Sequence, residues 1–268
     1  MEIGGRIFDT ENNCYIMGIL NVTPDSFSDG GKWTVLGASL THAEEMLRDG
    51  ADIIDVGGES TRPGHTVISD QEEIDRVVPV IEALHARIDA VISIDTYKSA
   101  VAQAAINAGA HLVNDIWGLK HDAKMAGIIA KSGVACCLMH NRDNKDYGVF
   151  IDDFIRDLSG AVDIAKSAGI ADDKIILDPG VGFAKTQEMN LEAINRVDAI
   201  RALGYPVLLG TSRKRVIGNV LDLPVTERVE GTLATTVIGV MRGCAFVRVH
   251  DIKENHRAIA MTRAVLGR

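Results

Sequence analysis

The fold is decided by the stretch Val91-Ile-Ser-Ile-Asp-Thr-Tyr-Lys-Ser-Ala-Val-Ala-Gln-Ala-Ala-Ile-Asn-Ala-Gly-Ala-His-Leu-Val-Asn114. It begins with a short apolar run, continues with apolar residues at helical spacing, and resumes after a glycine with a second apolar run. This order predicts a strand, a helix and a second, parallel strand, because parallel strands need a crossover connection, which is usually a helix. The stretch is therefore one unit of an α/β fold.

Eight such units fill the chain of 268 residues. We predict strands at residues 15–20, 53–56, 91–94, 112–114, 134–139, 175–177, 207–209 and 245–249. We predict helices at residues 36–48, 71–88, 98–108, 122–131, 152–168, 188–203, 226–242 and 252–266. Glycines that allow a positive φ end many of these helices, namely Gly50, Gly109, Gly133, Gly169 and Gly204.

The number of units and the chain length favour a closed (β/α)8 TIM barrel that forms one domain over residues 1–268. A doubly wound open sheet shows the same alternation and is the rival architecture. No GxGxxG motif follows the first predicted strand, which counts against the rival. Residues 3–13 predict a short N-terminal β-hairpin that caps the bottom of the barrel.

Composition limits the kinds of partner. The net charge of −9 and the pI of about 5.4 argue against a nucleic-acid-binding surface. None of the four cysteines is in a CxxC pair, so reduced thiols are the simpler interpretation. The sequence begins without a signal peptide and has no apolar run near eighteen residues, which predicts a cytoplasmic protein without a membrane partner.

Polar residues follow the predicted strands, at the end of a barrel where active sites lie. Taken singly, each has an ordinary explanation, because Asp and Asn favour helix caps and turns and cations are common on surfaces. Turns do not require seven such groups at the mouth of the barrel, which is the end where the carboxyl ends of its strands meet. We therefore predict a ligand whose polar groups are complementary to these side chains. The seven are Asn21, Asp95, Asn114, Asp178, Lys214, Arg248 and His250.

The chemistry of these groups suggests two parts to the ligand. Two carboxylates, an amide and a lysine suit a fused heterocycle that carries an amino group, ring N–H groups and a carbonyl. Asn21, Arg62, Arg248 and His250 suit an anion with its divalent metal, because Mg²⁺ takes oxygen ligands. We therefore expect small-molecule substrates and Mg²⁺.

Two long motifs and five short ones carry a family resemblance. The long ones are Met17-Gly-Ile-Leu-Asn-Val-Thr-Pro-Asp-Ser-Phe-Ser-Asp-Gly-Gly31 and Gly50-Ala-Asp-Ile-Ile-Asp-Val-Gly-Gly-Glu-Ser-Thr-Arg-Pro-Gly64. The short ones are Ser93-Ile-Asp-Thr96, Asn114-Asp115, Leu177-Asp-Pro-Gly-Val-Gly-Phe183, Gly210-Thr-Ser-Arg-Lys-Arg215 and Arg248-Val-His250. In these motifs, over nearly the whole chain, the sequence resembles the dihydropteroate synthases.

The resemblance implies a transferase of folate biosynthesis. Such an enzyme condenses 6-hydroxymethyl-7,8-dihydropterin pyrophosphate with p-aminobenzoate to give 7,8-dihydropteroate and pyrophosphate. The resemblance also implies Mg²⁺, a family that is a target of sulfonamides, and a homodimer formed through the last helices. The small and apolar residues at 231–243 suit a packing face in such a dimer, but they equally suit the core side of a barrel helix.

The resemblance assigns residues to each substrate. The pterin residues are Asp95, Asn114, Asp178, Lys214, Met139, Phe183 and Gly210. The pyrophosphate residues are Asn21, Arg62, Arg248 and His250, with Asn21 as the metal ligand. The p-aminobenzoate residues are Phe27, Thr61, Arg62, Pro63, Phe183, Ser212 and Lys214. Asp29, Asp95, Lys214 and Arg248 are the expected catalytic groups.

Two alternative functions remain open, and one segment of the sequence departs from the family pattern. A pterin-binding corrinoid methyltransferase shares the barrel and the pterin carboxylates but needs no pyrophosphate site. A non-catalytic pterin-binding paralogue keeps the slot but not the loop at residues 23–31, which is intact here. The stretch Asn141-Arg-Asp-Asn-Lys-Asp-Tyr147 departs from the family pattern, so we expect an altered fifth loop, beside a structural His140, without loss of activity.

Overall fold

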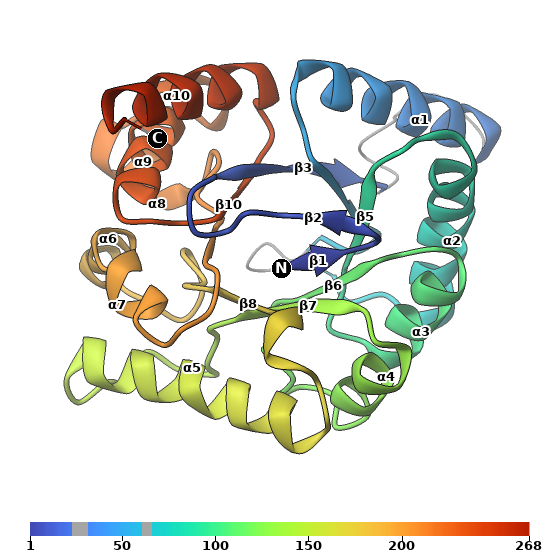
Figure 1. Cartoon of the computed structure of the whole chain (residues 1–268), viewed down its shortest axis with the longest axis horizontal. Coiled ribbons are helices and arrows are strands. Elements are labelled where there is room, and N and C mark those ends of the chain that lie inside the picture. Colours follow the sequence, from blue (N-terminus) through green and yellow to red (C-terminus); the bar gives the residue numbers. More distant parts are fainter. Residues whose placement is uncertain (23–31, 61–65, 268) are drawn as a thin grey trace.

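Eight parallel strands form the centre of the molecule in the computed structural model (Figure 1), which describes residues 1–22, 32–60 and 66–267. The predicted strands are confirmed, and each differs from its prediction by one residue at one end. The observed strands are β3 Tyr15–Asn21, β4 Ile53–Gly57, β5 Val91–Asp95, β6 Leu112–Asp115, β7 Ala135–Met139, β8 Ile175–Asp178, β9 Leu208–Leu209 and β10 Phe246–Val249.

The sheet closes into a barrel. The strand order is β8-β7-β6-β5-β4-β3-β10-β9, so each strand neighbours the next one in the chain and β10 returns to β3. An isolated parallel bridge between Leu177 and Val207 joins the two ends of this order, and the Leu177 N–H donates to the Pro206 carbonyl at 2.9 Å. The predicted barrel is therefore confirmed, and the open doubly wound sheet was the wrong alternative.

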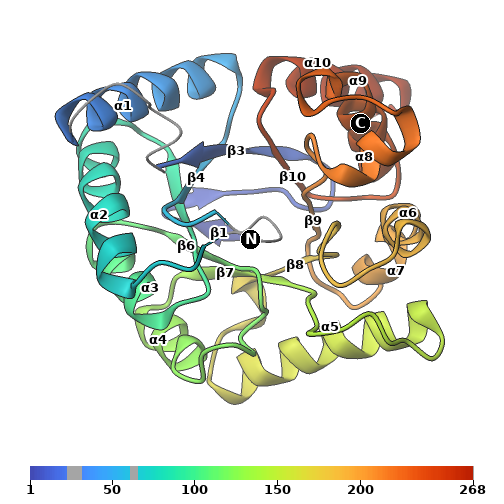
Figure 2. The same cartoon turned by 180° about the vertical axis from the view of Figure 1, so that it is seen from behind.

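Helices surround the barrel on all sides (Figures 1 and 2). They are α1 Lys32–Asp49, α2 Asp70–Arg87, α3 Ser99–Asn107, α4 Met125–Ser132, α5 Phe150–Ser167, α6 Gln187–Asn195, α7 Val197–Arg201, α8 Arg215–Leu221, α9 Val229–Met241 and α10 Ile252–Val265. Among the helices so described, none is long and apolar enough to cross a membrane.

Two helix predictions were wrong. The helix predicted at 188–203 is interrupted at Arg196, which has φ −108° and ψ 28°, so α6 and α7 are separate. Apolar spacing continues across this break, and periodicity therefore did not detect it. The short helix α8 follows β9 and was missed, because seven residues are too few to show a helical period.

The N-terminal hairpin plugs the bottom of the barrel, as predicted, although its strands are shorter than the range 3–13. Strand β1 Glu2–Ile3 pairs antiparallel with β2 Arg6–Ile7. Ile3 and Phe8 pack against one buried residue near the start of each barrel strand. These eight residues are Met17, Ile53, Val91, Leu112, Ala135, Ile176, Leu208 and Phe246.

A polar layer lies above this apolar floor. Side chains two residues apart in a strand point to the same face, so the next inward position of each strand follows the floor residue by two. These positions hold Ile19, Asp55, Ser93, Asn114, Cys137, Asp178, Gly210 and Arg248. The alternate residues, among them Ile54, Ile92 and Val113, pack in the larger core beneath the helices. Polar groups thus collect at the carboxyl end of the barrel.

Candidate active site

Arg248 is the centre of a buried ion network in this layer. Its Nε donates to Asp55 Oδ2 at 2.6 Å, and one terminal nitrogen donates to Asp95 Oδ2 at 2.6 Å. Asn114 donates its amide N–H to the same oxygen of Asp55 at 3.1 Å. Within the described residues, the other carboxylate oxygens of Asp55 and Asp95 have no hydrogen-bond partner. Two buried acceptor atoms therefore remain for a ligand.

Burial shifts the protonation of this network. It raises the pKa of Asp95 to about 7, while Arg248 acts to lower that pKa and the charge of Asp55 acts to raise it. Burial also disfavours the charged form of Arg248, yet Asp55 and Asp95 raise its pKa above the usual value. Arg248 is therefore a permanent cation, and Asp95 titrates near neutral pH.

A second charged pair lies across the layer. Asp178 Oδ1 accepts the Gly180 N–H at 2.6 Å, and Lys214 Nζ donates to the Val181 carbonyl at 2.7 Å. Burial raises the pKa of Asp178 and lowers that of Lys214 to about 8, while each group's charge opposes the other's shift. A Cβ on Gly210 would lie 3.6 Å from Asp178 Oδ2 and 3.7 Å from Lys214 Nζ. Both charged groups therefore lie within van der Waals contact of the place that a methyl group at position 210 would take.

An apolar cluster borders the charged groups. Met139, Tyr97 and Ile116 are buried together, and Trp117 and Phe183 pack against them. The ring of Phe183 lies 5.1 Å from Lys214 Nζ. Charged groups beside an apolar wall suit a flat ring whose edge is polar and whose face is apolar.

Asn21 and His250 lie at two other strand ends of the mouth. A Cβ on Gly57 would lie 3.6 Å from Asn21 Oδ1 and 3.8 Å from Asp95 Cβ, so Asn21 is beside the ion network. His250 Nδ1 lies 3.0 Å from Ser212 Oγ, and the His250 backbone N–H donates to the same oxygen at 3.1 Å. In the described part of the chain, no three His, Cys, Asp or Glu side chains form a metal-binding group.

The structure brings most of the predicted site residues to one mouth. Arg248 donates directly to Asp95 and is joined to Asn114 through Asp55, and Asp178 and Lys214 both lie close to Gly210. Met139 and Phe183 both belong to the apolar cluster beside these groups. The predicted residues Phe27, Asp29, Thr61, Arg62 and Pro63 lie outside the described residues.

Sequence reasoning missed Asp55. This side chain is fully buried and shares Arg248 with Asp95, so the arginine is already paired with two carboxylates. The available signal was a charged residue within the otherwise apolar run Ile53-Ile-Asp-Val56. Asp55 follows the floor residue Ile53 by two and therefore points into the barrel.

A further buried network was also missed, at the start of the segment after β4. Lys98 Nζ lies 2.6 Å from Glu59 Oε2 and 2.8 Å from Glu73 Oε2. It also donates to the Ile68 carbonyl at 2.8 Å, and the Ile68 N–H donates to Glu59 Oε2 at 3.0 Å. Lys98 thus joins Glu59 to Ile68 beside the mouth.

Fold and site together define a barrel enzyme that binds a flat heterocycle. The "Pterin binding enzyme" family model matches residues 17–250. The dihydropteroate synthase of Clostridium beijerinckii is 58% identical over the full length of both chains, and that of Bacillus subtilis is 54% identical over 94% of this chain and 89% of its own.

Solved structures agree with these relatives. A dihydropteroate synthase from Clostridium difficile, solved in the presence of pteroic acid, matches with a TM-score of 0.94 and 50% identity over 97% of this chain and 99% of its own. One from Yersinia pestis, solved with a sulfonamide drug, matches with a TM-score of 0.93 and 41% identity over 100% and 99%. The chain belongs to the dihydropteroate synthase family of pterin-binding enzymes. It is a transferase of folate biosynthesis, and the methyltransferase and non-catalytic alternatives find no support.

Proposed function

We propose that the mouth of this barrel binds 6-hydroxymethyl-7,8-dihydropterin pyrophosphate between Asp95 and Asp178 and joins it to p-aminobenzoate. The two carboxylates accept the amino and ring N–H groups of the pterin, and Asn114 and Lys214 donate to its acceptor atoms. The observation that carries this proposal is the position of Asp178 and Lys214 beside Gly210, where a Cβ would lie 3.6 Å from Asp178 Oδ2 and 3.7 Å from Lys214 Nζ. Met139 and Phe183 cover the faces of the ring.

The charge of the mouth supports a dissociative reaction. The described groups at its centre are three carboxylates, Asp55, Asp95 and Asp178, and two cations, Lys214 and Arg248. Departure of pyrophosphate leaves positive charge on the hydroxymethyl carbon of the pterin. Preorganised negative charge stabilises that carbon, so Asp95 acts best when ionised, above a pH of about 7. The arylamine of p-aminobenzoate then forms the new C–N bond and releases a proton. We also assign Asp29, outside the described residues, to stabilising this carbon.

The pyrophosphate lies toward Asn21, Arg62, Arg248 and His250 in this proposal. Asn21 supplies an amide oxygen of the kind that Mg²⁺ takes, and the pyrophosphate and water supply the other ligands. When bound, Mg²⁺ stabilises the negative charge that develops on the leaving group. Arg248 contributes a fixed positive charge at the same place, because its two carboxylate partners hold its guanidinium in position.

We place p-aminobenzoate beside Ser212, Lys214 and Phe183. The remaining residues of this site in our proposal, Phe27, Thr61, Arg62 and Pro63, lie outside the described residues. The Yersinia pestis relative was solved with a sulfonamide drug. We therefore propose that sulfonamides compete for the same position here.

Direct titration with a pterin tests the site. Asp178→Asn is expected to weaken pterin binding by about tenfold or more, because a carboxylate acceptor becomes an amide that also presents two donors. Asp251→Asn is the matched control, since Asp251 pairs with Arg213 at the same end of the barrel but outside the pterin residues. Equal affinity of the Asp178 variant and the wild type would contradict the pterin assignment.

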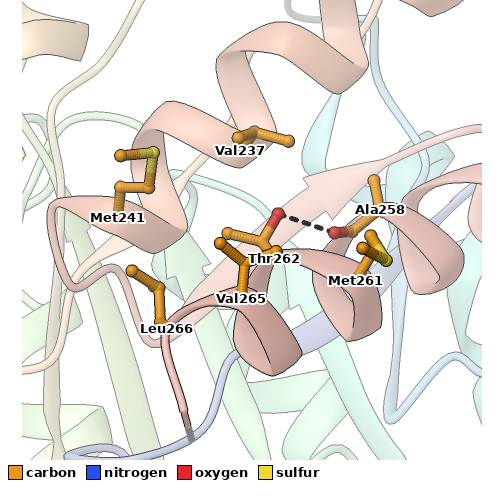
Figure 3. Close-up of a pocket in the computed structure, with 7 residues that line it drawn as sticks. All are labelled: Val237, Met241, Ala258, Met261, Thr262, Val265 and Leu266. Carbon is orange, nitrogen blue, oxygen red and sulfur yellow. Dashed lines mark hydrogen bonds between the residues drawn. The ribbon is translucent and has the colours of Figure 1, made fainter.

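An apolar groove between α9 and α10 supports the homodimer that we also propose (Figure 3). It has a volume of about 350 Å³ and is lined by Val237, Met241, Ala258, Met261, Thr262, Val265 and Leu266. Met241 is 59% exposed, Met261 65% and Val265 73%. Large apolar side chains gathered on one face are typical of a surface that a partner covers. A second copy would present the same face, as twofold symmetry requires.

Sedimentation analysis tests the dimer. Met241→Asp is expected to shift the wild-type dimer to monomer, because a charge would be buried in an apolar contact. Val149→Asp is the control, because Val149 has a matching exposure of 60% but precedes α5. A dimer that persists in the Met241 variant would contradict the assignment.

All four cysteines are free thiols, which supports the cytoplasmic location that we propose.

A further inference from the structure

Lys185 is a buried lysine outside the groups assigned to either substrate. It lies in the segment between β8 and α6 and is only 4% exposed. Its Nζ lies 2.8 Å from His140 Nδ1, and it donates to the Gly180 and Phe183 carbonyls, each at 3.1 Å. Three acceptors therefore surround the Lys185 Nζ, as many as an ammonium group can bind.

His140 is arranged to accept from this lysine. Its Nε2 lies 3.0 Å from Asp157 Oδ2 in α5, and the same carboxylate oxygen also binds Arg142. The Asp157 carboxylate can only accept, so His140 Nε2 carries the proton that is donated to it, and Nδ1 of the neutral ring accepts from Lys185. Burial lowers the pKa of His140 to about 3, in agreement with a neutral ring. His140 thus has the structural role that we predicted.

The carbonyls that Lys185 holds belong to the wall of the proposed pterin slot. Lys214 donates to the carbonyl of Val181, which lies between Gly180 and Phe183 in the chain. Two lysines therefore donate hydrogen bonds to carbonyls of the segment 180–183. Lys214 binds it from the mouth, and Lys185 binds it from behind. The Phe183 ring rests 5.1 Å from the Lys214 ammonium, so the position of this segment sets both the apolar wall and one of the charged groups.

Backbone conformation and two further hydrogen bonds also constrain this segment. Gly180 has φ +62°, and a Cβ there would come within 2.0 Å of the His140 carbonyl oxygen. The Gly182 N–H donates to Asn190 Oδ1 at 2.6 Å, and the Tyr147 hydroxyl donates to the Ala184 carbonyl at 3.0 Å. The second contact comes from the fifth loop, so the stretch that departs from the family pattern supports this same segment.

We propose that Lys185, held by His140 and Asp157, is a positioning residue that sets the pterin slot by fixing the carbonyls of Gly180 and Phe183. The proposal rests on the proposed pterin site and deepens it. Lys185 touches no substrate in this scheme. It acts through Phe183 and through the carbonyl partner of Lys214, and it ties their position to β7 and α5 on the outer side of the barrel.

Lys185→Met tests the proposal, because methionine has a similar length but donates no hydrogen bond. Three buried acceptors then lose their donor, and we expect the segment to shift. The dissociation constant for a pterin such as 6-hydroxymethylpterin, measured by calorimetry without catalysis, is expected to rise about tenfold or more. Thr236→Val is the matched control, because it removes a buried 2.7 Å hydrogen bond between α9 and α10, to Asn255, that does not involve the segment 180–183.

The control separates positioning from a general loss of stability. Thr236→Val is expected to unfold at a lower temperature yet bind the pterin as the wild type does. If Lys185→Met fails to fold, Lys185→Leu, which also donates no hydrogen bond, takes its place with the same measurement. A folded Lys185 variant with unchanged pterin affinity would overturn the proposal. A wild-type protein that binds no pterin would instead overturn the proposed site itself.

Discussion

Replacement of Asp55 by asparagine links the ion network to the pH at which the site works. Asp55 binds Arg248 at 2.6 Å and Asn114 at 3.1 Å, and its charge helps burial to raise the pKa of Asp95 to about 7. Asp55→Asn keeps the volume but removes the charge, so Arg248 then acts on Asp95 alone. At an effective dielectric constant of about 20, the negative charges of Asp55 and Asp95 repel each other by roughly 3 kcal/mol. We expect the pKa of Asp95 to fall by about one to two pH units, because solvent at the mouth screens part of this energy.

The assay is a calorimetric titration with 6-hydroxymethylpterin from about pH 5 to about pH 8, a range that spans the titration of Asp95. In the wild type, pterin affinity is expected to fall as the pH drops through about 7, because Asp95 must be ionised to accept an N–H. In Asp55→Asn this fall is expected at a lower pH. Asp52→Asn is the control, since Asp52 is a partly buried carboxylate just before β4, at the other end of the barrel. An unchanged or higher midpoint in the folded Asp55 variant would show that the charge of Asp55 does not raise the pKa of Asp95.

Two further substitutions test the surroundings of the site. Lys98→Met leaves the buried carboxylates of Glu59 and Glu73 without their shared cation, and urea denaturation is expected to show a loss of about 3 kcal/mol in the free energy of unfolding. A loss within about 0.5 kcal/mol would show that the network does not stabilise the fold. Gly210→Ala places a methyl group in the proposed slot and is expected to weaken pterin binding about tenfold while the protein stays folded. Gly160→Ala in α5 meets no atom within 4 Å and serves as the control, and equal binding by both variants would argue against the slot.

The sequence was sufficient for the barrel and for the end at which its site lies. The eight apolar runs are the buried strands, and the polar residues that follow them meet because the carboxyl ends of parallel strands share one edge. Asp95, Asn114 and Arg248 were predicted on this basis and lie in one network. The family motifs added the assignment of these groups to a pterin and a pyrophosphate.

Contacts between distant parts of the chain were not predictable in the same way. Asp55 and Arg248 are 193 positions apart, and nothing local to either residue indicates the other. The contact of Lys185 with His140 likewise depends on how the segment after β8 lies against the end of β7. The break at Arg196 was missed for a different reason, since apolar residues continue at helical spacing on both sides of it.

Pyrophosphate release is the most direct test of the proposed reaction. The wild-type protein would be given 6-hydroxymethyl-7,8-dihydropterin pyrophosphate with and without p-aminobenzoate, in Mg²⁺ and in EDTA. We predict release that requires both p-aminobenzoate and the metal, with 7,8-dihydropteroate as the other product. Absence of release from a folded protein that still binds a pterin would contradict the account.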